Sequence, residues 1–120
     1  MNNFEFIDGS IALLDLVNPL WEGLNTHQKI NSNYYFDKFI NDKNIKVKLD
    51  LIKCKENNLY VGYCITIVNK DSIGEIDALF VDKEYREYGL GDKLMGRSLE
   101  WLNSNHVKTK IIGAAITKMY

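Results

Sequence analysis

The amino-acid sequence predicts a single α+β domain that spans residues 1–120 and contains a mixed, mostly antiparallel sheet flanked by helices. Three observations predict this fold class. The 120-residue chain is 46% hydrophobic and 26% charged, which is the balance of one globular domain with its own core. A central segment alternates apolar and polar residues with the period of a strand, and the segments around it repeat with the period of a helix. The expected order is β-α-α-β-β-β-α-β.

The first elements are a short strand and two helices. A strand over residues 4–7 ends at an Asp-Gly pair, which favours a turn. Apolar residues then recur every 3.6 positions over residues 10–24, which predicts a helix with one face in the core. Pro19 either kinks this helix or divides it in two, because proline fits only the first turn of a helix. A second helix is expected over residues 32–42.

Three strands follow and form an antiparallel meander. Residues 47–54 alternate in the manner of a half-exposed strand, and an Asn-rich turn at residues 56–58 leads into the next strand. That strand, over residues 59–68, is rich in β-branched and aromatic residues. A second polar turn leads into the third strand, over residues 74–81.

The last elements are a helix and a strand. A helical pattern runs from Gly89 to about Asn105, and Thr109–Ile116 returns to the pattern of a strand. A strand, a glycine turn, a helix and a strand form a β-α-β unit, in which the two strands run parallel. The residues expected on the buried side of the helix are Leu90, Leu94, Leu99 and Leu102.

The loop before this helix carries the strongest functional signal, Arg86-Glu87-Tyr88-Gly89-Leu90-Gly91. The first amides of a helix have no acceptor within the helix and lie at the positive end of its dipole, so they bind phosphate groups. Gly89 and Gly91 let the backbone approach an anion closely because they carry no Cβ atom. The Walker loop and the dinucleotide fingerprint are both excluded, since their required lysine and glycine positions are not filled.

This loop and the order of elements resemble the GNAT superfamily of N-acetyltransferases, whose acetyl-coenzyme A loop reads Arg/Gln-x-x-Gly-x-Gly/Ala. Arg86, Gly89 and Gly91 match that pattern. The resemblance implies an acyl-CoA N-acyltransferase-like fold. It also implies an enzyme that moves an acetyl group from acetyl-coenzyme A to a primary amine of a small molecule or peptide by direct attack. Acetyl-coenzyme A is then the cosubstrate, and no metal is expected.

The same resemblance implies roles for single residues. In the family, loop amides hold the pyrophosphate and the preceding strand pairs with the pantetheine arm. The implied cofactor-binding residues are Leu79, Val81, Arg86, Glu87, Tyr88, Gly89, Leu90, Gly91 and Asp92. The N–H of Leu79 is also the implied catalytic donor to the thioester carbonyl, and donors of this oxyanion type contribute about 3 kcal/mol.

Aminolysis requires a neutral amine, so a general base is expected. Glu75 is the predicted base, because period-two alternation places it on the same side as Leu79 and because some family members carry a glutamate there. Asp77 shares that side and is an alternative base or an acceptor-binding residue. The alternative interpretation is that the carboxylates of Glu75 and Asp77 simply face solvent from the sheet. Glu22 and Tyr34 fall where the family builds its acceptor pocket.

The sequence ends at Tyr120, before the last helix, the two last strands and the acid tyrosine of the resembled family. The final predicted strand then has an exposed edge, which favours a homo-oligomer formed through that edge. The alternative function is a non-catalytic coenzyme A-binding module or a truncated, inactive remnant.

Composition excludes several other classes. A net charge of −1 gives no general attraction to nucleic acid. No window approaches the roughly 20 apolar residues of a membrane span, so a cytoplasmic protein is expected. Cys54 and Cys64 lack metal or disulfide spacing and are expected to be reduced, buried strand residues. His27 and His106 have no neighbours at ligand spacing.

Overall fold

The structure is a computed structural model that describes residues 3–9 and 44–112 of the chain. Within them the elements follow in the order β1 (Phe4–Gly9), β2 (Lys46–Cys54), β3 (Tyr60–Val68), β4 (Ile73–Val81), the 3₁₀ helix η2 (Lys83–Tyr88), α3 (Leu90–Ser104) and β5 (Thr109–Ile112). The helices expected over residues 10–24 and 32–42 lie outside the described residues, as does the end of the last predicted strand. None of the helices in the described ranges is long and apolar enough to cross a membrane.

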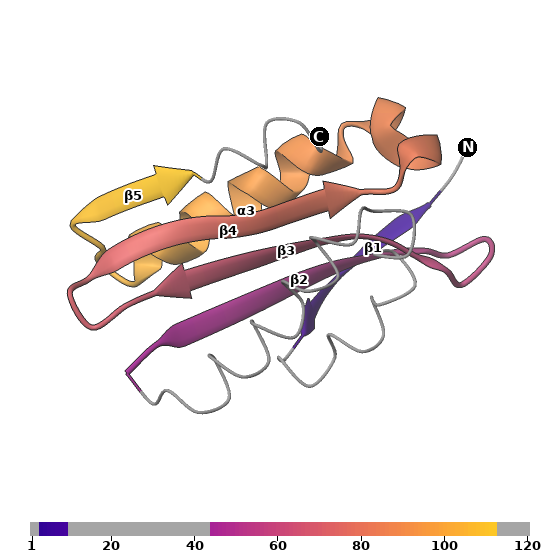
Figure 1. The fold of residues 1–120 in the computed structure, drawn as a ribbon. Coiled ribbons are helices and arrows are strands. Elements are labelled where there is room, and N and C mark those ends of the chain that lie inside the picture. Colours follow the sequence, from indigo (N-terminus) through magenta and orange to yellow (C-terminus); the bar gives the residue numbers. More distant parts are fainter. Residues whose placement is uncertain (1–2, 10–43, 113–120) are drawn as a thin grey trace, which may run out of the picture.

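The five strands form one sheet in the order β1-β2-β3-β4-β5. Strands β1 to β4 pair antiparallel, and β4 and β5 pair parallel. Helix α3 connects the two parallel strands and lies across one face of β3 and β4 (Figure 1). The predicted meander and the predicted β-α-β unit are therefore both confirmed, as is the mixed, mostly antiparallel sheet.

The turns between the meander strands depend on asparagine. Asn58 adopts a φ of 60° at the end of the first turn, a conformation that Asn tolerates better than most residues. The side-chain oxygen of Asn57 accepts a hydrogen bond from the amide of Leu59 at 3.0 Å. In the second turn the Asn69 side chain accepts from the amides of Asp71 and Ile73. These local bonds begin the next strand at a defined residue.

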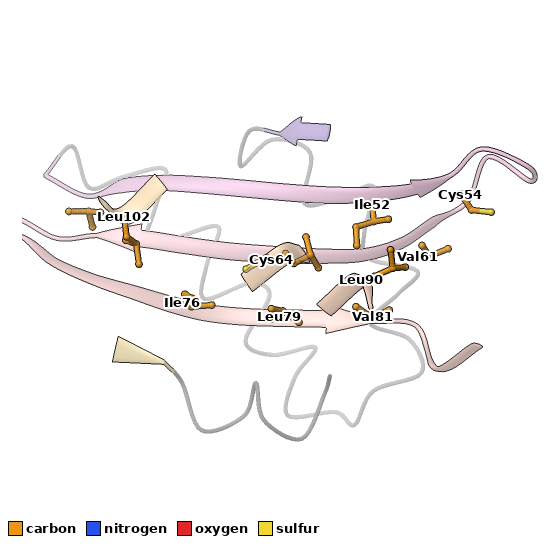
Figure 2. Close-up of a cluster of buried hydrophobic side chains, with 11 residues drawn as sticks. Ile52, Cys54, Val61, Cys64, Ile76, Leu79, Val81, Leu90 and Leu102 are labelled. Atoms are coloured by element: carbon orange, nitrogen blue, oxygen red, sulfur yellow. The ribbon is translucent and has the colours of Figure 1, made fainter. Parts of the chain in front are cut away.

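Two apolar clusters lie on opposite faces of the sheet. The first packs beneath α3, and Figure 2 shows residues of β2, β3 and β4 that point into it, Ile52, Cys54, Val61, Cys64, Ile76, Leu79 and Val81. The second covers the other face and is formed by Leu49, Leu51, Tyr63, Ile65, Ile67 and Phe80. Strand β3 contributes to both clusters, which explains its nearly continuous apolar sequence. Cys54 and Cys64 are buried and free, as predicted.

The buried stripe of α3 differs from the prediction at one position. Leu90, Leu94 and Leu102 are buried as expected, whereas Leu99 is only partly buried. The fourth fully buried side chain is Ser98, which lies four residues from both Leu94 and Leu102. A buried serine hydroxyl requires hydrogen-bond partners, and Ser98 finds them in Thr66 and Cys64 of β3.

Candidate functional site

Strand β4 contains a β-bulge that divides it into two halves. Ile65 of β3 lies opposite Ala78, and the next residue of β3, Thr66, lies opposite Ile76. Asp77 is therefore the extra residue of the bulge. Because side chains alternate with a period of two, one extra residue reverses the alternation between the two halves of the strand.

Because of the bulge, the prediction that Glu75 and Leu79 lie on the same side of the strand is wrong. Leu79 points into the cluster beneath α3. Glu75 lies opposite Ile67, which belongs to the cluster on the other face, and directly opposite residues share a face. The two residues therefore do not lie on one side of the sheet. Period-two counting was wrong here because it assumed a regular strand without a bulge.

The main chain of the second half of β4 points its polar groups out of the meander. The amide of Asp82 donates to the carbonyl of Val61 at 2.7 Å, so this opposed pair is hydrogen-bonded. Hydrogen-bonded and non-bonded pairs alternate along antiparallel strands. The pairs Gly62–Val81 and Cys64–Leu79 are then non-bonded. The N–H and C=O groups of Leu79 and Val81 consequently point away from β3, toward the side of β5.

The described part of β5 leaves that side of β4 without a paired strand. Pairing begins at Ile73 opposite Thr109 and extends to Ile76 opposite Ile112. Between Asp77 and Val81, no strand within residues 3–9 and 44–112 accepts the outward-pointing groups of β4. This main-chain edge can therefore bind an extended ligand in the way that one strand binds another.

The chain turns sharply after β4. Asp82 caps η2 by accepting a hydrogen bond from the amide of Glu84 at 3.2 Å. Gly89 ends η2 and is also the N-cap of α3, with φ 71° and ψ 19° in the left-handed region. Among residues 3–9 and 44–112, no side chain caps the N-terminus of α3. The sequence predicted this glycine turn into the helix, but it did not predict η2.

Arg86 joins the loop to the end of β4. Its Nε atom donates to the carbonyl oxygen of Val81 at 2.8 Å, and its guanidinium carbon lies 5.8 Å from the centre of the Phe80 ring. A bond from a charged donor to a carbonyl is stronger than one between neutral groups. Arg86 therefore fixes the direction of the Val81 carbonyl and the path of the loop together.

These elements surround a hollow of about 270 Å³ at the carboxyl end of β4. Its walls are formed by Val81, Arg86, Gly89, Gly91 and Asp92. The structure thus brings together five of the predicted cofactor-binding residues. The hollow lies where the open edge of β4 meets the N-terminal amides of α3, so an anion in it would be at the positive end of the helix.

Three other predicted residues of the loop lie at its margins. Leu90 is buried in the cluster beneath α3, so only its main chain is available to a ligand. Tyr88 is half-exposed, and its ring lies 5.4 Å from that of Phe4 on β1. Glu87 is exposed on η2.

The charges of the loop largely cancel. Lys83, Arg86 and Lys93 are offset by Glu84, Glu87 and Asp92. The attraction for an anion must therefore come mainly from the oriented amides of the backbone and not from the net charge of the side chains.

The acceptor side of the site is described only in part. Glu75 and Asp77 are half-buried on β4. Glu22 and Tyr34, predicted to contact the acceptor, lie outside the described residues. Among residues 3–9 and 44–112, no three His, Cys, Asp or Glu side chains gather as ligands for a metal ion.

Comparisons with known structures agree with this geometry. The chain is similar to a Pyrococcus furiosus protein assigned as an acetyl transferase, with a TM-score of 0.70 and 15% identity over 93% of this chain and 83% of that one. It is also similar to the aminoglycoside N-acetyltransferase AAC(6')-Iy in complex with coenzyme A, with a TM-score of 0.71 and 8% identity over 95% and 78% of the two chains.

A third similar structure is the ribosomal-protein-alanine N-acetyltransferase of Brucella melitensis biovar Abortus 2308. Its TM-score is 0.64, with 13% identity over 98% of this chain and 88% of that one. At such identities these structures establish the fold. No curated protein matches the chain in sequence.

A family model adds sequence-level support that does not depend on the fold. The model described as Acetyltransferase (GNAT) family matches residues 12–118, which is most of the chain. It covers the bulged strand, the glycine loop and helix α3. The chain therefore belongs to the acetyltransferase (GNAT) family, and its enzymatic class is acyltransferase.

Proposed function

We propose that the chain transfers an acetyl group from acetyl-coenzyme A to a primary amine of a small molecule or peptide by direct attack. The observation that carries this proposal is the main-chain surface formed by the end of β4 and the start of α3. It consists of the outward N–H and C=O groups of Leu79 and Val81, followed by the uncapped amides of α3 around the hollow. A long ligand with amide groups at one end and a pyrophosphate at the other fits this order of donors and acceptors.

Acetyl-coenzyme A supplies an activated thioester, and the chain supplies binding and electrostatics. Val81 pairs through its main chain with the pantetheine arm, and the amides near Gly89 and Gly91 hold the pyrophosphate. The N–H of Leu79 donates to the thioester oxygen, where negative charge grows during attack. The side chain of Leu79 is fully buried, which holds this amide in place.

Glu75 is the proposed general base, either directly or through a water molecule. Its carboxylate lies on the face opposite α3, so we propose that the amine approaches the thioester from that face. Two of the similar structures are named for an aminoglycoside and for the alanine of a ribosomal protein, which supports both small-molecule and peptide amines as acceptors. Glu22, Tyr34 and Asp77 remain proposed acceptor contacts.

Calorimetry with acetyl-coenzyme A, followed by thiol release with a panel of amines, tests this function. The panel contains spermidine, kanamycin and an alanine-terminated peptide. We expect acetyl-coenzyme A to bind with a micromolar dissociation constant and the release of free thiol to depend on the amine. Glu75→Gln should then lower the rate at neutral pH more than it weakens cofactor binding. Binding without turnover would favour a coenzyme A-binding module, and no binding would refute the proposal.

We also propose that the chain self-associates through β5. This strand lies at the end of the described sheet, and Ile111 and Ile112 are 45% and 50% exposed. An exposed apolar edge strand favours pairing with a second copy. Sedimentation should show a dimer that Ile111→Lys weakens. A monomer at high protein concentration would contradict this proposal.

A further inference from the structure

Helix α3 is joined to the sheet by a buried polar cluster, here called the Ser98 cluster and formed by Ser98, Thr66 and Cys64. The Thr66 hydroxyl donates to the Ser98 oxygen at 2.8 Å, and the Ser98 oxygen lies 3.0 Å from the sulfur of Cys64. All three residues are 0% exposed. These contacts cross from the middle of the helix to the central strand of the sheet.

The Ser98 cluster lies next to the part of β4 that carries the outward amides. Cys64 is directly opposite Leu79, and Thr66 is directly opposite Ile76, so the two residues flank the bulge at Asp77. Figure 2 shows Cys64 and Leu79 on neighbouring strands of this face. Ser98 therefore contacts the two β3 residues of this face that lie on either side of the bulge.

The same helix carries the phosphate-binding end of the site. Ser98 lies eight residues after Leu90, which is about 12 Å along a helix that rises 1.5 Å per residue. The helix is a rigid rod over this length. A shift of α3 along the sheet would therefore change the separation between its N-terminal amides and the N–H of Leu79.

The Ser98 cluster opposes such a shift more strongly than the apolar contacts around it. Hydrogen bonds weaken steeply with distance and angle, and a buried hydroxyl that loses its partner is unfavourable. The contacts of Leu94 and Leu102 are non-directional and tolerate small displacements better. Burial raises the pKa of Cys64 to about 11, although its contacts with the Ser98 and Thr66 hydroxyls lower it, so the sulfur remains a neutral thiol and a packing and bonding partner.

We infer that Ser98 is a positioning residue for coenzyme A. Through Thr66 and Cys64 it fixes α3 on the sheet, so that the pyrophosphate amides and the Leu79 N–H keep the separation that one cofactor molecule spans. This inference rests on the proposed function. It assigns to Ser98 no contact with the cofactor.

Comparing ligands that reach one or both ends of the site separates positioning from general stability. ADP carries the pyrophosphate but lacks the pantetheine arm, whereas coenzyme A carries both. The dissociation constant of ADP divided by that of coenzyme A, measured by calorimetry below the unfolding transition, reports whether the two ends of the site have the separation that coenzyme A spans. We expect Ser98→Ala to lower this ratio about tenfold through weaker coenzyme A binding, with ADP affinity nearly unchanged.

Matched variants sharpen the test. Thr66→Val removes the hydroxyl at nearly constant shape and should behave like Ser98→Ala, whereas Thr66→Ser keeps the hydroxyl and should restore the wild-type ratio. Ser104→Ala removes an exposed hydroxyl from the same helix and should have no effect. Equal losses of ADP and coenzyme A affinity, or an unchanged ratio in both hydroxyl-deleting variants, would overturn the inference. Failure of the wild-type chain to bind coenzyme A would instead refute the proposed function.

Discussion

The Nε atom of Arg86 donates a hydrogen bond of 2.8 Å to the carbonyl oxygen of Val81. Arg86 follows Val81 by five positions and lies within η2, so the bond joins η2 to the end of β4. It links the last outward-pointing residue of β4 to the loop that precedes α3. The motif arginine thus holds the main chain of the site in shape, a role that the loop sequence alone does not reveal.

We predict that Arg86→Ala weakens coenzyme A binding about tenfold. Hydrogen bonds to charged groups contribute about 1.5–3 kcal/mol, and the exposed position of Arg86 favours the lower end of that range. Arg86→Gln keeps a side-chain N–H and should recover part of the affinity. Lys83→Ala removes a positive charge from the same turn and is the control in calorimetry. An equal loss in Lys83→Ala would assign the effect to charge alone.

Gly89→Ala should destabilise the fold and weaken cofactor binding together. The φ of 71° costs a residue with a Cβ about 1–2 kcal/mol, although no atom of the described residues lies within 4 Å of the added Cβ. Gly96→Ala is the matched control, because its added Cβ also has no neighbour within 4 Å in the described part of the chain but lies inside α3. There alanine should stabilise the helix by about 1 kcal/mol. Thermal unfolding that moves in the same direction for both variants would contradict this account.

Gly74→Ala should destabilise the protein by about 1–3 kcal/mol through overpacking. An added Cβ would lie 2.5 Å from Cδ2 of Leu102 and 3.2 Å from Cγ1 of Val107, so α3 approaches β4 closely at this glycine. Chemical denaturation measures the loss. The double variant Gly74→Ala/Leu102→Ala should lose less stability than the sum of the two single variants, because the second change removes the clash. If the stability losses of the two single variants simply add in the double variant, the clash is relieved by residues other than Leu102.

Asp8 should contribute stability that disappears in acid. Partial burial raises the pKa of its carboxyl, but Lys48 and Arg97 together lower it below the ordinary value near 4. Because the folded-state pKa is depressed, the contribution is fully present above about pH 4 and is lost as pH falls through the folded-state pKa. Asp8→Asn should therefore be less stable than wild type at pH 7, and this difference in stability should shrink as the pH falls below about 4.

The magnitude of this effect should be small and sensitive to salt. The Asp8 side chain is 74% exposed, and its ion pairs with Arg97 and Lys48 measure 2.8 and 3.4 Å. Exposed pairs of this kind are screened by solvent and by ions. A stability difference between wild type and Asp8→Asn that did not shrink as the pH fell, or that grew with added salt, would contradict the assignment.

The sequence predicted the three-strand meander, the parallel last strand and the glycine loop because these depend on local patterns. Alternation located the meander, and the turn residues at Asn58 and Gly89 have conformations that few other residues accept. The bulge at Asp77 could not be predicted in this way. A bulge is determined by how two strands pair over their whole length, and no residue type marks it.

Ser98 was missed for a related reason. On a helical wheel a serine between leucines reads as a polar interruption of the stripe. Its burial makes sense only beside Thr66 and Cys64, which are more than 30 residues away in sequence. Polar partners across such a distance are a tertiary property, and periodicity within one helix contains no information about them.

The outward-pointing amides of β4 have a consequence for how this strand responds to experiment. In hydrogen exchange, the Leu79 amide should exchange quickly in the free protein, while that of Phe80, bonded within the ladder to β3, should be protected. Mutational scanning of the same residues would report packing, since the side chain of Leu79 is buried and the proposed donor is its backbone N–H. Another apolar residue of similar size at position 79 would present the same N–H, so the chemistry of this strand is encoded by its pairing and not by the identity of its residues.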